Sequence, residues 1–223
     1  MTRSAAALLA VIHSALTPPA STGSHLTSPA LGNAENAAAI AARNRVLTGV
    51  LQPAAIDLLN PAAGATLGNR AWLLAIRAGG NTRAVDRYER ELAPLADGVA
   101  LENERQETLW RHIEEFTPRF LATHPDGAVV RTSCTLKELE GAISSCDGPA
   151  LARAGSGVCY AYFPSSGGIR LGPKAVIEFS PEAGKRTLDL WPAPGGDFEI
   201  MQRVKNLFDP ANLLNRGRLY RRI

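Results

Sequence analysis

The 223-residue sequence predicts an α+β protein, in which an antiparallel or mixed sheet is covered by helices on one face. Short apolar runs typical of strands are interspersed with amphipathic stretches typical of helices. Glycine, proline and asparagine separate most of these segments. The strands and helices do not alternate in the regular way that a doubly wound parallel sheet requires.

The N-terminal quarter predicts two helices and two short strands. The apolar run at residues 4–15 predicts a helix, followed by a short strand over 20–26 and a loop over 27–36. Residues 37–50 predict an alanine-rich helix that ends before Pro53, because proline lacks an N–H and restricts the residue before it. The apolar run at 55–59 predicts a strand, and the Asn60-Pro61 turn ends it.

The middle of the chain predicts one buried strand and two long helices. Residues 71–77 are continuously apolar up to Arg77, and a glycine pair follows, which is typical of a strand and its turn. Asn81 or Thr82 can cap the next helix, which runs to about residue 96. A further helix is expected over 103–116, with aromatic and aliphatic side chains on one face.

The last third predicts three strands, one short helix and a terminal helix. Strands are expected over 128–133, 157–163 and 176–179, with a short helix over 136–143. Asp197 has a residue type that favours a helix start, so the final helix is expected to begin there.

Composition indicates an ordinary soluble protein of the reducing cytoplasm. Hydrophobic residues make up 45% and charged residues 20%, and the formal net charge of +3 gives no reason to expect nucleic acid. Three cysteines without Cys-x-x-Cys spacing argue against a disulfide framework, a structural zinc or an iron–sulfur cluster. Four scattered histidines predict no metal site. No stretch approaches the roughly twenty apolar residues of a membrane span.

The first residues also resemble a weak signal peptide. One positive charge precedes an apolar run, and small residues follow it. His13 interrupts this run, and Pro18-Pro19 stand where a small-x-small cleavage site is expected. The sequence therefore favours a buried or amphipathic helix, and a secreted α+β binding protein is the alternative.

The C-terminal tail combines a short amphipathic helix with a tight turn. Its apolar residues predict one buried helix face (Met201, Val204, Leu207 and Phe208), and two leucines are expected to re-enter the core (Leu213 and Leu214). Pro210 ends the helix. Asn215 and Gly217 suit a tight turn, in which glycine allows close approach of the backbone.

The tail resembles the C-terminus of the FAD-linked oxidases of the vanillyl-alcohol-oxidase superfamily. The matching positions are Lys205, Phe208-Asp209-Pro210, Leu214-Asn215, Gly217 and Arg218, and Arg216 stands where the family usually has proline. Upstream, residues 51–60, 72–81, 107–110, 130–133 and 155–157 are similar to the cap domain of these oxidases. The pattern is most similar to the glycolate oxidase FAD-binding subunit and its relatives, and covers most of residues 40–223.

The resemblance implies a domain organisation and a set of partners. Residues 37–223 correspond to the C-terminal cap domain with its flavin-side segment, and residues 1–36 form an N-terminal helix and loop that belong to the cap or extend it. The glycine pairs form no phosphate-binding Gly-x-Gly-x-x-Gly loop, so the N-terminal FAD-binding domain is absent. FAD would therefore be bound by a separate domain, in cis or in trans. No metal cofactor is expected. An iron–sulfur partner subunit and a small 2-hydroxy acid substrate are further expectations.

Six residues are candidates for the site under this resemblance. Arg131 interrupts an apolar strand and could bind a substrate carboxylate, or could be a strand-edge residue that points outward. Tyr160 and Tyr162 alternate on one strand, so they either orient a substrate hydroxyl or pack on the sheet. Asn215 and Gly217 are either cofactor-binding residues beside the flavin or a structural turn. Arg218 either neutralises negative charge on a reduced flavin or pairs with a carboxylate of its own domain.

The expected function is the substrate and cap portion of an FAD-dependent oxidoreductase of the glycolate oxidase type. This portion is expected to be inactive without an FAD-binding domain, and the sequence assigns no catalytic residue. The alternative is a non-catalytic subunit or scaffold module that retains the cap fold.

Overall fold

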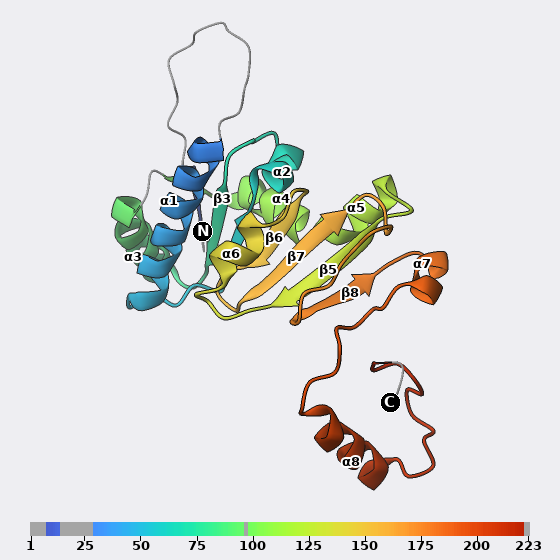
Figure 1. Cartoon of the computed structure of the whole chain (residues 1–223). Coiled ribbons are helices and arrows are strands. Elements are labelled where there is room, and N and C mark those ends of the chain that lie inside the picture. The colour runs from blue at the N-terminus through green and yellow to red at the C-terminus, as the bar shows by residue number, and fades with distance from the viewer. Residues whose placement is uncertain (1–7, 14–28, 96–97, 221–223) are drawn as a thin grey trace, which may run out of the picture.

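A computed structural model describes residues 8–13, 29–95 and 98–220, and its centre is one eight-stranded sheet (Figure 1). The strand order is β4-β1-β3-β2-β6-β7-β5-β8, and every neighbouring pair in it is antiparallel. The strands are β1 (Leu8–His13), β2 (Ala55–Leu59), β3 (Leu73–Ala78), β4 (Gly98–Leu101), β5 (Ala128–Ser133), β6 (Ala150–Arg153), β7 (Val158–Phe163) and β8 (Ala175–Phe179).

Helices cover both faces of the sheet. The front face packs against α1 (Pro29–Thr48), α3 (Thr82–Leu92) and α6 (Leu139–Ser144), and the back face packs against α2 (Pro61–Gly64), α4 (Asn103–Glu114) and α5 (Phe116–Thr123). Two 3-10 turns, Ala65–Leu67 and Ala93–Leu95, follow α2 and α3. The short helix α7 (Glu182–Thr187) follows β8, and α8 (Phe198–Phe208) is the last. The α+β prediction is confirmed, but the expectation of helices on one face is wrong.

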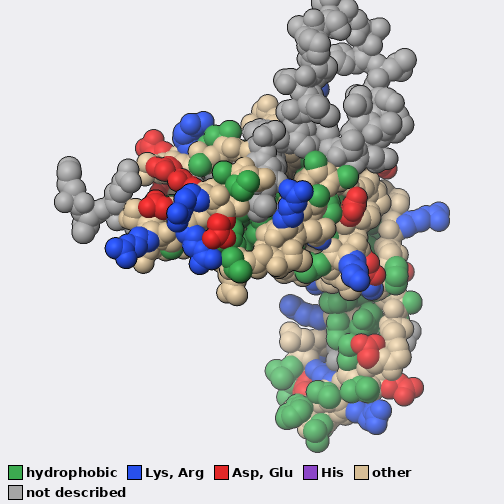
Figure 2. Space-filling model, turned by 90° about the vertical axis from the view of Figure 1, so that its left-hand side faces the viewer, with side chains coloured by type: hydrophobic (Ala, Val, Ile, Leu, Met, Phe, Trp, Pro, Cys, Tyr) green, Lys and Arg blue, Asp and Glu red, His purple; other side chains and the backbone are tan. Residues whose placement is uncertain are grey.

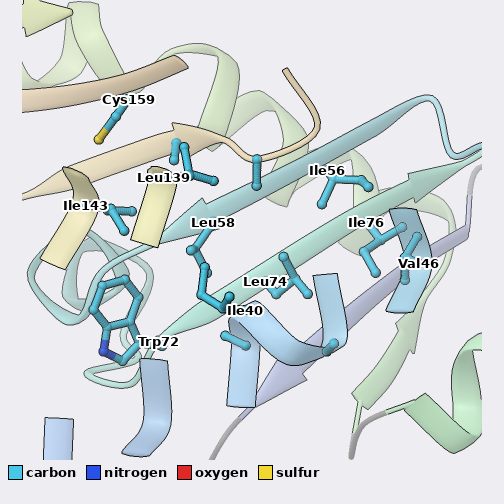
Figure 3. Close-up of a cluster of buried hydrophobic side chains, with 14 of the residues drawn as sticks. Ile40, Val46, Ile56, Leu58, Trp72, Leu74, Ile76, Leu139, Ile143 and Cys159 are labelled. Atoms are coloured by element: carbon cyan, nitrogen blue, oxygen red, sulfur yellow. The ribbon is translucent and has the colours of Figure 1, made fainter. Parts of the chain in front are cut away.

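The two-sided cover follows from the strand sequences. Ile56 and Leu58 of β2 lie in the front cluster, while Leu59 lies in the back cluster (Figure 3 shows the front one). Because successive side chains of a strand point to opposite faces, such a strand must bury both of them. Fully burying one such leucine contributes about 2 kcal/mol.

The structure corrects the N-terminal predictions. Residues 8–13 of the expected helix form strand β1, which lies between β3 and β4. Its Leu-Leu-Ala-Val-Ile run suits a strand that pairs on both sides, because β-branched residues favour the pleated backbone. The loop expected over 27–36 is wrong from Pro29, where α1 starts; proline suits a first helical position. The expected strand 20–26 lies outside the described residues.

Further along the chain, most expected elements are confirmed to within a few residues. The five expected strands correspond to β2, β3, β5, β7 and β8, and Asn81 caps α3 by accepting a bond from the Ala84 N–H. The helix expected over 103–116 is α4, which is followed directly by α5. Strands β4 and β6 were not predicted. Each has four residues, too few to show a clear period.

The terminal helix does not bury its apolar side. Val204, Leu207 and Phe208 are 51%, 74% and 78% exposed, so the expected buried face is wrong, and so is the expectation that Leu213 and Leu214 re-enter the core. In Figure 1, α8 and the chain after it lie apart from the sheet, which explains this exposure. Asp197 occupies the N-cap position, but its side chain makes no capping hydrogen bond.

Candidate functional site

Arg131 and Tyr160 lie directly opposite each other on the back face of the sheet. They are cross-strand partners of β5 and β7, and both side chains are partly exposed. The Arg131 Nε lies 3.5 Å from a Glu178 carboxylate oxygen, and its Nη1 donates a 3.1 Å hydrogen bond to the Ser133 hydroxyl. Strand β5 lies between β7 and β8, so Arg131 is not a strand-edge residue.

Tyr162 shares this face but is buried, with 3% of its surface exposed. Its hydroxyl is 2.9 Å from the Thr117 hydroxyl, and its ring packs 4.8 Å from Phe116 and 5.2 Å from Phe120, measured between centroids. Burial raises the pKa of Tyr162 to about 12. The sheet-packing interpretation therefore describes Tyr162, and Tyr160 presents the accessible phenol.

The structure adds a buried ion pair that the sequence analysis missed. The Asp57 carboxylate, 2% exposed, accepts a 2.6 Å hydrogen bond from the Arg153 guanidinium on the neighbouring strand. Burial raises the pKa of Asp57, and Arg153 opposes that shift. The available signal was a single charge inside the apolar run 55–59, because a buried charge needs a partner. Arg153 went unnoticed because β6 was not predicted.

The Asp57–Arg153 pair lies on the same face as Tyr160 and borders a hollow of ≈ 610 Å³. Leu151 pairs with Tyr160, and Arg153 stands two residues further along the same strand, so the two side chains share the back face. The hollow is formed by residues 51–57, 153 and 155–156 together with Leu47. Arg131, Arg153 and Tyr160 are each partly exposed on this face, and guanidinium and phenol groups of this kind can bind a carboxylate and orient a hydroxyl.

Asp209 organises the tail. Its two carboxylate oxygens accept 2.8 Å hydrogen bonds from the backbone N–H groups of Leu213 and Leu214. The Lys205 ammonium bonds both to Asp209 and to the carbonyl of Leu214. Lys205 and the two N–H donors lower the pKa of Asp209 to about 2. These bonds give the Lys-x-x-Phe-Asp-Pro pattern a structural reason.

The tight turn predicted in the tail is present. Asn215 and Gly217 have positive φ angles of 49° and 66°, and the Arg218 N–H donates a 3.1 Å bond to the Asn215 carbonyl. Arg216, which replaces the usual proline, donates through Nε to the carbonyl of Asn212. Asn215 and Arg218 border a hollow of ≈ 450 Å³ whose walls include Trp191 and Phe208.

Around this turn lies an exposed apolar surface, called here the tail apolar surface. Figure 2 shows hydrophobic side chains gathered on this lower part of the molecule. Its members are each at least half exposed: Ile200, Val204, Leu207, Phe208, Leu213 and Leu214. Contiguous apolar surface of this kind marks an interaction site in soluble proteins.

The predicted site residues therefore fall into two separate groups. Arg131 and Tyr160 lie on the sheet, whereas Asn215, Gly217 and Arg218 lie in the tail, which Figure 1 shows apart from the sheet. Within the described residues, no group of three or more His, Cys, Asp or Glu side chains could hold a metal, and no helix is long and apolar enough to cross a membrane.

Comparison with known proteins finds a similarity in the tail. Residues 193–219 match the family model of FAD linked oxidases, C-terminal domain. This segment contains α8 and the turn with Asn215, Gly217 and Arg218. No curated protein matches the chain. The match thus supports the FAD-linked oxidase resemblance at the tail.

Proposed function

We propose that this chain is the substrate and cap portion of an FAD-dependent oxidoreductase that acts on a 2-hydroxy acid of the glycolate or lactate type. The observation that carries the proposal is the tail, whose family match coincides with the Lys205–Asp209 bonds and the Asn215–Arg218 turn. FAD, when bound, accepts the hydride of the substrate. The chain's own residues bind and orient the reactants.

In this proposal the sheet supplies the substrate side. Arg131, with Arg153 as a second cation, binds the carboxylate, because a guanidinium fork matches two carboxylate oxygens. Glu178 holds Arg131 at 3.5 Å until the substrate carboxylate replaces it. Tyr160 orients the substrate hydroxyl, while Tyr162 is buried and bonds to the Thr117 hydroxyl.

The tail supplies the cofactor side in the same proposal. Arg218 would lie on the flavin side, where its guanidinium would balance negative charge. An FAD-binding domain, in cis or in trans, covers the tail apolar surface and carries the phosphate-binding loop that this sequence does not show. A cytoplasmic location fits the three free thiols, and an iron–sulfur subunit would be the electron acceptor.

The first experiment is an FAD titration of the full chain, alone and with the FAD-binding domain of an FAD-linked oxidase fused upstream or added in trans. We expect fluorescence quenching only when that domain is present, together with dye-coupled oxidation of glycolate or lactate. Arg131→Lys should raise KM strongly because it loses the fork, while Arg87→Lys on the exposed side of α3 should not change KM. Tight FAD binding by the chain alone would contradict the need for a separate domain.

The alternative is a non-catalytic subunit or scaffold module with the cap fold. The separation of α8 and the chain after it from the sheet in Figure 1 favours it, because Arg131 belongs to strand β5 of that sheet. Binding to an FAD-binding domain without any turnover of 2-hydroxy acids, with normal FAD content, would support this alternative.

A further inference from the structure

A hollow of ≈ 710 Å³ lies on the front face of the sheet, beside α6. Its floor is formed by β5 and β7, where Thr132, Ala161 and Phe163 border it. One wall is α6 with the residues that flank it, and the other is the segment 170–175 that leads into β8. The front side of β8 belongs to a separate apolar cluster, which includes Ile177. The hollow therefore lies between two separate covers of one sheet face.

Cationic side chains outnumber acidic ones in the lining of this hollow. Lys137 lies just before α6, whereas Arg170 and Lys174 belong to the opposite wall, and all three are exposed. The acids of the lining are Glu138 and Asp147, which lie before and after α6. Because a helix rises about 1.5 Å per residue, the six residues of α6 separate these two acids by about 9 Å of helix.

The Glu138 carboxylate is already engaged and leaves the other cations without a counter-charge. Its oxygens accept a 2.8 Å bond from the Thr135 N–H and 2.9 Å bonds from the Lys174 ammonium. The Thr135 N–H, together with Lys174, lowers the pKa of Glu138 to about 2. Lys137 and Arg170 make no hydrogen bond or ion pair within the part of the chain that the structure describes. Two such cations on one hollow favour an anionic occupant.

The remaining lining is largely apolar. It includes Ala142 of α6, Ala161 and Phe163 of β7, and two prolines, Pro149 and Pro173. Small-molecule sites in proteins have volumes of about 300–1,000 Å³ and combine apolar walls with a few polar groups that fix the orientation of the ligand. The hollow meets both conditions, because its cations border an apolar floor.

We propose that this hollow is a binding site for a small organic carboxylate with an apolar body. Lys137 and Arg170 bind the carboxylate from opposite walls, and the guanidinium fork matches its two oxygens. The apolar body lies against α6 and β7. Arg131 and Tyr160 lie on the other face of the sheet, so this site is separate from the proposed substrate side and does not depend on FAD.

The test is a titration of the isotope-labelled full chain with sodium benzoate, followed by the amide signals in NMR spectra. Benzamide has the ring without the charge, and inorganic phosphate has charge without the ring. Benzoate should shift the signals of residues 132–148 and 161–175 along one saturable curve, with a Kd about tenfold or more below that of either control probe.

Four results would overturn the proposal. Equal affinity for benzamide would mean that the hollow recognises no charge, and equal affinity for phosphate would mean that it recognises no apolar body. Shifts confined to residues 200–218 would place the binding on the tail. Signals that do not saturate with benzoate would mean that there is no site.

Variants test the assigned residues one at a time. Arg170→Gln and Lys137→Gln should each weaken benzoate binding about tenfold, and both positions are exposed, so the fold should be kept. Arg83→Gln, on an exposed position of α3 outside the hollow, is the matched control and should leave the Kd unchanged. Circular dichroism checks the fold of each variant. An unchanged Kd in both Arg170→Gln and Lys137→Gln would contradict the assignment, wherever benzoate binds.

Discussion

Asp57 lies beside Arg153 on neighbouring antiparallel strands, and its carboxylate accepts a 2.6 Å hydrogen bond from the Arg153 guanidinium. The two partners differ in exposure, since 2% of the Asp57 side chain and 38% of the Arg153 side chain is accessible. Removal of Arg153 should therefore lower the stability of the fold more than removal of the Asp57 carboxylate. Without Arg153 a charge stays buried and unpaired, whereas without the carboxylate the guanidinium can turn to water.

Arg153→Met should lower the free energy of unfolding by about 2 kcal/mol at neutral pH, below the usual range for a buried pair because Arg153 is partly exposed. Asp57→Asn should cost less than about 1 kcal/mol. Burial already raises the pKa of Asp57, and loss of Arg153 raises it further. Protonation is then favoured in the folded state, so the deficit of Arg153→Met should shrink as the pH falls through that raised pKa. Urea unfolding at several pH values measures the free energy of unfolding of each variant. Equal losses in Arg153→Met and Asp57→Asn at neutral pH would contradict the expected asymmetry.

The hydroxyl of Tyr162 should contribute to stability. Tyr162→Phe removes the 2.9 Å contact with Thr117 and should cost about 1 kcal/mol. Tyr160→Phe is the matched control and should change stability by less than about 0.5 kcal/mol, because the Tyr160 phenol is partly exposed and has no hydrogen-bond partner among the described residues. Alkaline difference absorbance should show one tyrosine that titrates near pH 12, which disappears in Tyr162→Phe. Persistence of that titration in the variant would assign it elsewhere.

Acid should release the tail loop before the sheet unfolds. Lys205 and the N–H groups of Leu213 and Leu214 lower the pKa of Asp209 to about 2, from an ordinary value near 3.8. A lowered pKa means that this stabilisation is complete above the ordinary value and is lost as the pH falls through about 2. The NMR signals of residues 209–215 should shift over this range while those of the sheet stay in place. In Asp209→Asn these signals should be displaced already at neutral pH and should no longer shift between pH 4 and pH 2.

How far the sequence predicts this structure depends on the range of the interactions. Strand β3 and the cap of α3 by Asn81 are local, and both were predicted. Strand β1 was not, because only its pairing with β3 and β4 distinguishes it from an apolar helix. For α8 the local pattern predicts an apolar helix face correctly. It does not predict whether anything covers that face, and Leu207 is exposed. The Asp57–Arg153 pair needs the register of β2 and β6, which no local pattern supplies.

The tail apolar surface should matter for association and not for the fold. Leu207→Asp should change the free energy of unfolding by less than about 0.5 kcal/mol, because 74% of Leu207 is exposed. The same change should weaken binding to an FAD-binding domain at least tenfold if the domain covers this surface. Gln202→Asp, on an exposed position of the same helix, is the control for charge. Titration calorimetry measures the affinity of both variants for the FAD-binding domain. An unchanged affinity in Leu207→Asp would remove this surface from the proposed interface.

Gly157 should tolerate no side chain. Its φ is +75°, and a Cβ there would lie 2.1 Å from the backbone oxygen of Cys134, a contact that requires the turn between β6 and β7 to move. Gly168 has a similar φ of +78°, but a Cβ there would meet open space, so Gly168→Ala isolates the backbone term of about 1 kcal/mol. Gly157→Ala should cost at least about 3 kcal/mol by the added clash. Thermal unfolding of the two variants separates the effect of the steric clash from that of the positive φ. Equal shifts in Tm would mean that the turn relaxes freely around the added Cβ.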